Sequence, residues 1–140
     1  MKLTHVEEKK VVEAIQAAEG QTSGEIRVHI AKKIHGTIYQ DACTVFESLG
    51  MTQTQEKNGI LIFLVPSQKQ FTIIGDLGIH QKVGNSFWDS IRDVMQDDFK
   101  KGDFIQGLIK GIEKCGQELA KHFPRCSNDK NELSDQVTTS

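Results

Sequence analysis

Three polar side chains stand where predicted strands begin or end, namely Glu25, Asn58 and Asp76. Carboxylate, amide and backbone carbonyl oxygens are the ligands that hard cations take, and a glycine such as Gly75 lets a backbone carbonyl approach closely. Asp103, at the start of the last predicted helix, is a fifth candidate. The spacing is not that of an EF-hand loop. We therefore predict a site for a hard divalent cation, Ca²⁺ or Mg²⁺.

Each candidate side chain also has a structural role as its alternative. Asp103 is placed to cap a helix, and Asp76 in Gly-Asp-Leu-Gly is a typical turn former. Asn58 precedes a glycine and can serve the turn that enters a strand, whereas Glu25 can be a solvated strand residue. The residue types alone leave both readings open.

Other chemistry has little support in the sequence. Histidines and cysteines lack the HxxxH or CxxC spacing of zinc sites, and no GxSxG elbow, P-loop or GxGxxG fingerprint occurs. Cys43 has no nearby base in sequence, so the catalytic residues stay unknown. We read His29 as a half-exposed strand residue, Asp97 and Asp98 as a solvated helix face, and Cys115 as a core thiol.

A central hairpin organises the predicted fold. Gly59–Val65 is apolar at nearly every position, which is typical of a strand covered on both faces. A turn at Pro66–Lys69 leads to a second run, Phe71–Ile74. Residues 25–31 alternate between polar and apolar side chains, which indicates a third strand with one buried face.

Helical periodicity fills the rest of the chain, at residues 4–19, 37–49, from Asn85 or Ser86 to about 100, and 103–122. The order α-β-α-β-β-α-α predicts an α/β fold, a three-layer α/β/α sandwich with a small mixed, Rossmann-like sheet. We predict one domain over residues 1–124 and a polar, disordered tail over 125–140.

This topology brings the candidate residues together. The first two strands form a right-handed crossover and run parallel, and the third strand runs back. Glu25, Asn58 and Asp76 should therefore share one edge of the sheet, with Pro66–Lys69 at the other. Asp103 joins them if the last helix packs back on the sheet.

Composition narrows the class of protein. The net charge of −2 over 140 residues offers no basic field for nucleic acid. The N-terminus lacks the apolar segment of a secretory signal, and the longest apolar run, about seven residues, is far below the ~20 of a membrane-spanning helix. Three scattered cysteines favour a reducing compartment. We expect a cytoplasmic monomer, with any protein partner unknown.

Four pieces of the chain carry a family resemblance: Thr22–Ile26, Lys57–Ile62, Ile74–Ile79 and Phe99–Phe104. With Gly107 and Gly111 they span about residues 5–122 in order. On these pieces the chain resembles the TPM domain, named for a thylakoid lumen phosphatase, a photosystem II repair protein and a worm receptor modulator.

The resemblance implies an α/β/α sandwich with calcium bound by acidic residues at one end of the sheet. Carried over by position, the ligand candidates are Glu25, Asn58, Asp76 and Asp103. The plant thylakoid branch of the family implies acid phosphatase activity. Lys57 stands where many relatives have an acidic residue, which removes one negative charge and one ligand.

Three functions follow as hypotheses. The first is a divalent-cation-binding domain of undetermined cellular role, and the second is a metal-dependent, acid-phosphatase-like hydrolase. The third is a non-catalytic protein-interaction module. No positioned nucleophile or arginine phosphate clamp stands out in the sequence, so binding ranks above catalysis.

Overall fold

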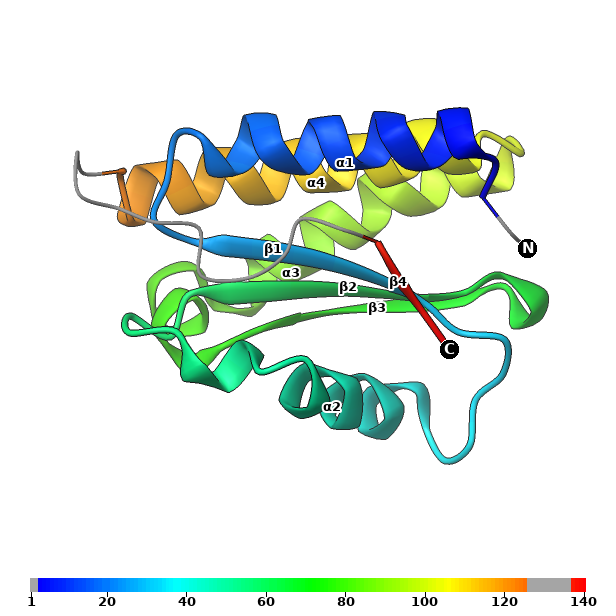
Figure 1. Ribbon diagram of the computed structural model, residues 1–140, viewed down its shortest axis with the longest axis horizontal. Helices are drawn as coiled ribbons and strands as arrows, with labels where there is room; N and C mark the ends of the chain where they lie inside the picture. The colour runs from blue at the N-terminus through cyan, green and yellow to red at the C-terminus, as the bar shows by residue number, and fades with distance from the viewer. Residues whose placement is uncertain (1–2, 126–136) are drawn as a thin grey trace.

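A mixed β-sheet runs through the middle of the protein (Figure 1). The computed structural model describes residues 3–125 and 137–140. The strands lie in the order β3-β2-β1-β4. Their bounds are β1 (Glu25–Ile30), β2 (Gly59–Val65), β3 (Gln70–Gly75) and β4 (Thr138–Thr139). β1 runs parallel to β2 and β4, and β3 runs antiparallel to β2, which confirms the predicted crossover and hairpin.

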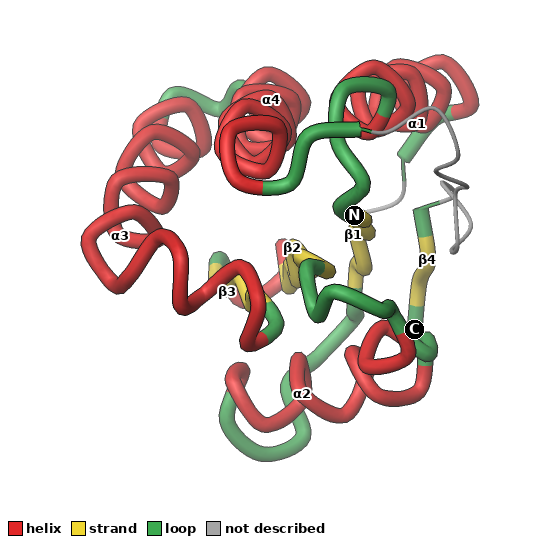
Figure 2. Tube along the Cα trace, turned by 90° about the vertical axis from the view of Figure 1, so that its left-hand side faces the viewer, coloured by secondary structure: helices red, strands yellow, loops and turns green. Residues whose placement is uncertain are grey.

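Helices cover both faces of this sheet. Their bounds are α1 (His5–Glu19), α2 (Ile38–Ser48), α3 (Leu77–Lys100) and α4 (Phe104–His122). α1, α3 and α4 lie on one side and α2 on the other, as the end-on view shows (Figure 2). The predicted α/β/α sandwich is therefore confirmed. None of the described helices combines the length and the apolar composition that crossing a bilayer requires.

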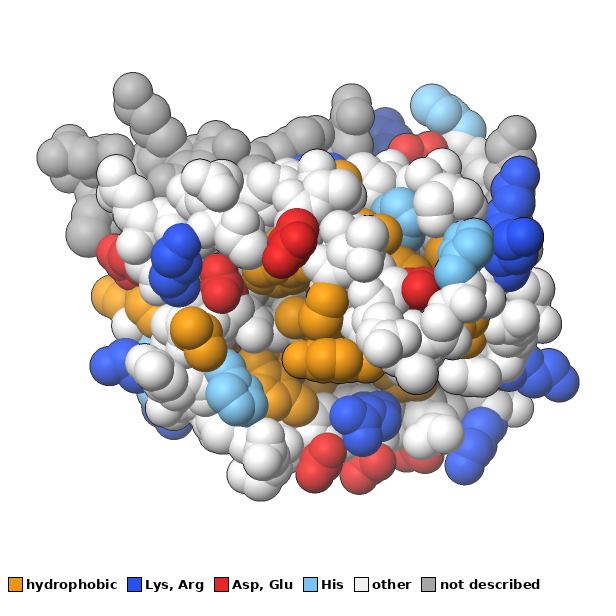
Figure 3. Space-filling model, turned by 90° about the horizontal axis from the view of Figure 1, so that it is seen from below, with side chains coloured by type: hydrophobic (Ala, Val, Ile, Leu, Met, Phe, Trp, Pro, Cys, Tyr) orange, Lys and Arg blue, Asp and Glu red, His pale blue; other side chains and the backbone are white. Residues whose placement is uncertain are grey.

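Alternate residues of β2 build two separate cores. Ile60, Ile62 and Leu64 pack toward α1, α3 and α4, whereas Leu61, Phe63 and Val65 pack toward α2. Each of these side chains is at most 1% exposed. This two-sided burial explains why β2 shows no alternation in sequence. From the α2 side, apolar side chains also show through the middle of the surface (Figure 3).

α3 begins earlier than its apolar periodicity predicted. Asp76 is its N-cap, and the helix runs from Leu77 across a break at Gly84, which has φ 74° and ψ 179°. The predicted start at Asn85 falls directly after this break. The first segment was missed because Gly75-Asp76-Leu77-Gly78 reads as turn chemistry when its neighbours are unknown.

The end of the chain also differs from the prediction. Thr138–Thr139 forms β4 beside β1, where we expected a disordered tail. Residues 126–136 of that tail lie outside the described residues, and the domain boundary at 124 stays a prediction. β4 escaped sequence analysis because two residues carry too little pattern to indicate a strand.

His29 explains how so short a strand is held. Its ring is 4% exposed and stacks on Phe63, with 5.4 Å between the ring centroids. Its Nδ1 lies 2.7 Å from the Thr138 hydroxyl and its Nε2 lies 2.7 Å from the Ser140 hydroxyl. The expectation of a half-exposed His29 is therefore wrong, because β4 covers the edge of β1.

Acid should destabilise the protein through His29. Burial, followed by the charge of Arg27 on the same strand, lowers the pKa of His29 below its ordinary value of 6.5. β2 presents Phe63 to the ring and β4 presents hydroxyl groups. Above 6.5 the ring is neutral in both states. As the pH falls through 6.5 the unfolded chain takes up the proton first, so the free energy of unfolding decreases.

Urea unfolding at about pH 8 and about pH 5.5 measures this contribution. The loss of stability on acidification should be smaller in His29→Gln than in the wild-type protein. His5→Gln, a change at an exposed residue of α1, is the matched control and should keep the wild-type loss. An equal loss in His29→Gln would show that the ring carries no pH-dependent stability.

Candidate functional site

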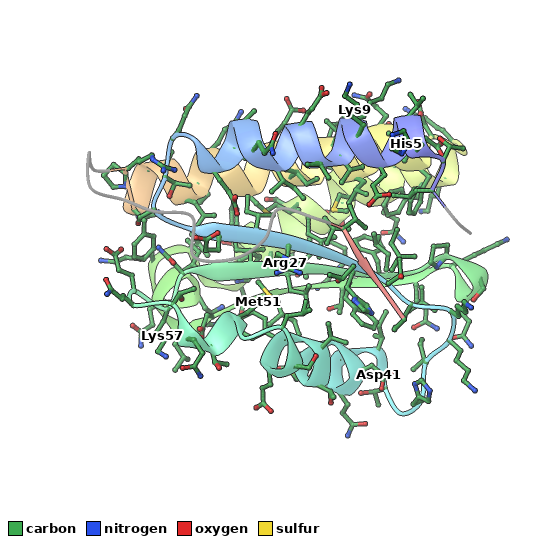
Figure 4. The ribbon with its side chains drawn as sticks, viewed as in Figure 1. His5, Lys9, Arg27, Asp41, Met51 and Lys57 are labelled. Atoms are coloured by element: carbon green, nitrogen blue, oxygen red, sulfur yellow. The ribbon has the colours of Figure 1, made fainter. Side chains whose placement is uncertain are left out.

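The three strand ends predicted to converge do lie at one edge of the sheet. Glu25, which begins β1, pairs with Gly59, which begins β2. The last residue of β3, Gly75, pairs with Ile60, and the Asp76 N–H donates to the Gly59 carbonyl over 2.9 Å. Figure 4 shows Lys57, the residue before Asn58, at this end of the sheet. The predicted shared edge is confirmed.

Asp103 does not join them. The other end of α4 lies at this edge, since a Cβ on Gly24 would come within 2.7 Å of Leu119 and Thr22 bridges to Pro124. α4 has 19 residues and rises ~28 Å, so it places Asp103 at the far end of the molecule (Figure 1). The expectation that Asp103 comes close is therefore wrong. Asp103 is exposed at the N-cap of α4, where its side chain makes no capping bond.

Asp76 combines a structural role with a free oxygen. Its Oδ1 accepts a hydrogen bond of 2.8 Å from the Leu77 N–H at the start of α3. Its Oδ2 is buried and has no hydrogen-bond partner among the described residues. A buried carboxylate oxygen without a partner is costly unless water or an ion satisfies it. This oxygen is therefore the atom of the edge that most needs a partner, and the helix N-terminus beside it stabilises the negative charge of Asp76.

Glu25 and Asn58 are buried rather than solvated. Each is 2% exposed, so the alternative of a solvated strand residue is wrong for Glu25. The Asn58 side-chain amide donates to the Ser23 hydroxyl over 3.3 Å, and this hydroxyl donates to Glu56 over 3.4 Å. These bonds tie the loop before β2 to the loop before β1.

Sequence analysis missed three residues of this edge. Ser23 and Glu56 belong to the hydrogen-bonded chain that reaches Asn58. Thr54 lies in the loop that leads into β2, and its Oγ1 is buried without a hydrogen-bond partner in the part of the chain that the structure describes. The Thr-Ser-Gly-Glu stretch at residues 22–25 was a signal for Ser23, but nothing in the sequence singled out Thr54 or Glu56.

The first turn of α3 packs directly on this loop. The Ile79 N–H donates to the Lys57 carbonyl over 3.2 Å. A Cβ on Gly78 would lie 2.1 Å from the Glu56 carbonyl oxygen and 2.6 Å from that of Lys57. The close approach requires glycine at Gly78, because any larger side chain would collide with these two backbone carbonyls.

Gly78→Ala should destabilise the protein by about 1–3 kcal/mol, because the obstructing atoms are backbone and cannot rotate away. Gly20→Ala is the matched control, since its Cβ would meet only carbonyl oxygens of α1 at 3.4 Å and 3.5 Å. Its free energy of unfolding should stay constant or rise by up to about 1 kcal/mol. Urea unfolding of both variants checks the difference. Equal free energies of unfolding for the two variants would mean that the loop at Glu56 and Lys57 moves away from the added methyl group without a loss of stability.

The side chains at this edge could offer a metal ion oxygen ligands with few negative charges. No group of three or more His, Cys, Asp or Glu side chains that could hold a metal occurs within residues 3–125 and 137–140. A cation here would therefore combine the two carboxylates of Glu25 and Asp76 with amide, hydroxyl and backbone carbonyl oxygens. The orphaned Asp76 Oδ2 fits such an ion. Hard cations accept this mixed oxygen set.

Of the two neighbouring aspartates on α3, Asp98 serves the fold and Asp97 does not. Asp98 is 6% exposed and forms an ion pair of 2.9 Å with Lys110, so its predicted place on a solvated helix face is wrong. The bond to Asp98 raises the pKa of Lys110. Asp97 is exposed, as predicted. Cys115 is fully buried in the core, which confirms the predicted core thiol, and this burial raises the pKa of its thiol to about 12.

Comparison with known proteins agrees with this architecture. A model of the TPM domain matches residues 2–118. The NMR structure of the BA42 protein from the psychrophilic bacterium Bizionia argentinensis is similar at a TM-score of 0.94 and 44% identity, over 100% of this chain and 97% of that one. Among curated proteins, none matches the chain.

Two more distant structures share the fold. The N-terminal domain of a protein from P. gingivalis has a TM-score of 0.69 at 20% identity, over 89% of this chain and 82% of that one. The N-terminal domain of a Corynebacterium glutamicum protein has a TM-score of 0.59 at 13% identity, over 84% and 74%. At these identities the likeness concerns the fold alone.

Proposed function

Because the chain belongs to the TPM domain family, we propose that it is a divalent-cation-binding domain whose ion is calcium. One observation carries this proposal. Asp76 Oδ2 is buried without a hydrogen-bond partner in the described part of the chain, at the edge where Glu25 and Asn58 also converge. A bound cation would satisfy that oxygen and offset the cost of burying it.

The ligand types favour calcium over magnesium. Calcium accepts six to eight oxygens in flexible geometry, whereas magnesium demands a near-ideal octahedron and keeps several of its waters. The side-chain oxygens of this edge come from the start of β1, the loop before β2 and the N-cap of α3, and such an irregular set suits the larger ion. With only two carboxylates the dissociation constant should lie between about 10⁻⁵ and 10⁻³ M.

Isothermal titration of chelator-treated protein with CaCl₂ tests the proposal. We expect one saturable site in this range, with MgCl₂ binding more weakly. Because calcium would bind only the folded chain, saturating calcium should also raise the melting temperature. No saturable binding up to several millimolar calcium, together with an unchanged melting temperature, would overturn the proposal.

A specific observation favours a binding role for the ion over a catalytic one. Leu77, directly after Asp76, exposes 65% of its surface beside the candidate site. A partner protein that covered Leu77 would gain the free energy of burying its apolar side chain. The cation would then order the interaction surface, as in the third of our sequence hypotheses.

The alternative hypothesis of phosphatase activity can be tested directly. If the cation polarises a phosphoryl oxygen and activates water, calcium or magnesium should stimulate hydrolysis of an aryl phosphate. Asp76→Asn should abolish that turnover. If the wild-type chain and Asp76→Asn both hydrolyse the aryl phosphate only at the background rate, with or without metal, the phosphatase hypothesis is wrong and cation binding remains the proposed function.

A further inference from the structure

β4 occupies an edge of the sheet by a small number of specific contacts. Ser140 donates its N–H to the Ile30 carbonyl over 3.0 Å and accepts the Lys32 N–H at 3.2 Å. Thr138 and Ser140 place their hydroxyls on the two nitrogens of the buried His29 ring, each at 2.7 Å. Any extended segment with hydroxyl side chains two residues apart could make these same contacts to β1.

The hydrogen-bond directions at His29 require a hydroxyl group at each of its two ring nitrogens. The Thr138 hydroxyl donates to the Val28 carbonyl over 3.3 Å, so it must accept from His29 Nδ1–H. The other nitrogen, Nε2, is then the acceptor for the Ser140 hydroxyl proton. Burial favours the neutral ring that this arrangement needs. A side chain without a hydroxyl would leave a buried ring nitrogen unpaired.

A cavity of about 450 Å³ lies beside the same segment, and Ser140 is among the residues that line it. Val137 and Thr139 line it, together with Leu3 of the N-terminal segment and with Glu8 and Lys32 at its sides. Val137 packs against the core, whereas Thr139 is exposed. The cavity therefore has room for a larger apolar side chain at the Thr139 position.

We propose that this edge of β1 accepts an extended peptide segment of a partner protein as an added strand. The segment would carry hydroxyl side chains at the positions of Thr138 and Ser140, and apolar side chains at the positions of Val137 and Thr139. The chain's own Val137–Ser140 fills the site in the resting state and so inhibits it. His29 determines the specificity for hydroxyls, and the cavity determines the preference for an apolar side chain. Strand addition of this kind is a common mode of peptide recognition.

The site is independent of the proposed calcium site. β1 begins at the proposed calcium edge with Glu25, and the peptide contacts run from Val28 to Lys32 toward its other end. Failure of calcium binding would therefore leave this proposal standing.

Peptide binding to the full chain tests the proposal. Ser140→Pro removes the N–H that bonds to Ile30 and should free the edge, whereas Thr139→Pro is the matched control because the bonds to Ile30 and Lys32 belong to Ser140. A fluorescein-labelled hexapeptide ending in Val-Thr-Thr-Ser should bind Ser140→Pro at least about tenfold more tightly than it binds the wild-type chain or Thr139→Pro. Anisotropy measures this ratio, which reflects the millimolar effective concentration of the tethered segment.

Variants of the peptide distinguish specific recognition of its hydroxyl groups from nonspecific binding. Replacing the first threonine by valine and the serine by alanine should weaken binding at least about tenfold. Replacing the second threonine by leucine should strengthen it. Equal affinity of hydroxyl and hydroxyl-free peptides for Ser140→Pro would overturn the role of His29, and no binding would overturn the site.

A second measurement covers the case in which proline does not free the edge. In the wild-type chain, millimolar peptide should shift the Thr138, Thr139 and Ser140 amides in NMR spectra as it displaces the tethered strand, because these residues then lose their contacts to β1. The hydroxyl-free peptide should shift none of them. Absence of these shifts with the hydroxyl peptide would also overturn the proposal.

Discussion

Replacing Phe63 with alanine is expected to lower the free energy of unfolding by about 3–5 kcal/mol. The side chain is 1% exposed at the centre of the core between β2 and α2, and it also supports the His29 ring by stacking. Truncation therefore removes a large buried apolar surface and leaves a cavity at the one place where core packing and the β4 contacts meet. Denaturant unfolding measures the loss.

A second readout distinguishes this account from a general loss of core volume. Because His29 would lose its stacking partner, the Ser140 and Lys32 amides should lose protection from hydrogen exchange before the central strand does. Tyr39→Ala, at an α2 residue that is 61% exposed, is the aromatic control and should change stability by no more than about 0.5 kcal/mol. A Phe63→Ala loss below about 1 kcal/mol would contradict the burial of this side chain.

Asp76→Asn is expected to weaken calcium binding at least about tenfold. At the proposed site the change removes one of two carboxylates, and calcium affinity depends strongly on the number of charged ligands. Asparagine is as good an N-cap as aspartate, so α3 should keep its start and the protein its stability. A loss of affinity without a loss of stability is thus the specific signature of a ligand.

Asp103→Asn is the matched control for this experiment. Asp103 is also the N-cap of a long helix, but it lies at the far end of α4. The two variants change the net charge equally, so a general electrostatic effect would weaken calcium binding in both. We expect the wild-type dissociation constant in Asp103→Asn. Equal weakening in both variants would show that calcium responds to overall charge and not to a site at Asp76.

The central part of the fold could be predicted because it rests on strong local patterns. The unbroken apolar run of Gly59–Val65 can be buried only between two layers, and the crossover rule then places β1 parallel to it. Strand direction alone puts Glu25, Asn58 and Asp76 at one edge. This part of the site needed no knowledge of side-chain packing.

The remaining features depend on tertiary contacts. The location of Asp103 follows from how α4 packs against α1 and α3, which periodicity does not state. The first turn of α3 exists because Gly78 can approach the loop at Glu56 and Lys57, and β4 exists because His29 holds two hydroxyls from a distant segment. Contacts between residues about a hundred positions apart leave no periodic signal in the sequence.

The most direct test of the calcium proposal is an NMR titration of the ¹⁵N-labelled chain with CaCl₂. The account predicts saturable amide shifts at the two loops and the helix start that form the edge, namely residues 23–26, 56–59 and 75–78, with one common dissociation constant. The Asp103 amide, at the far end of α4, should stay in place. Shifts confined to residues outside these three segments, or no saturable shifts at all, would contradict a calcium site at Asp76.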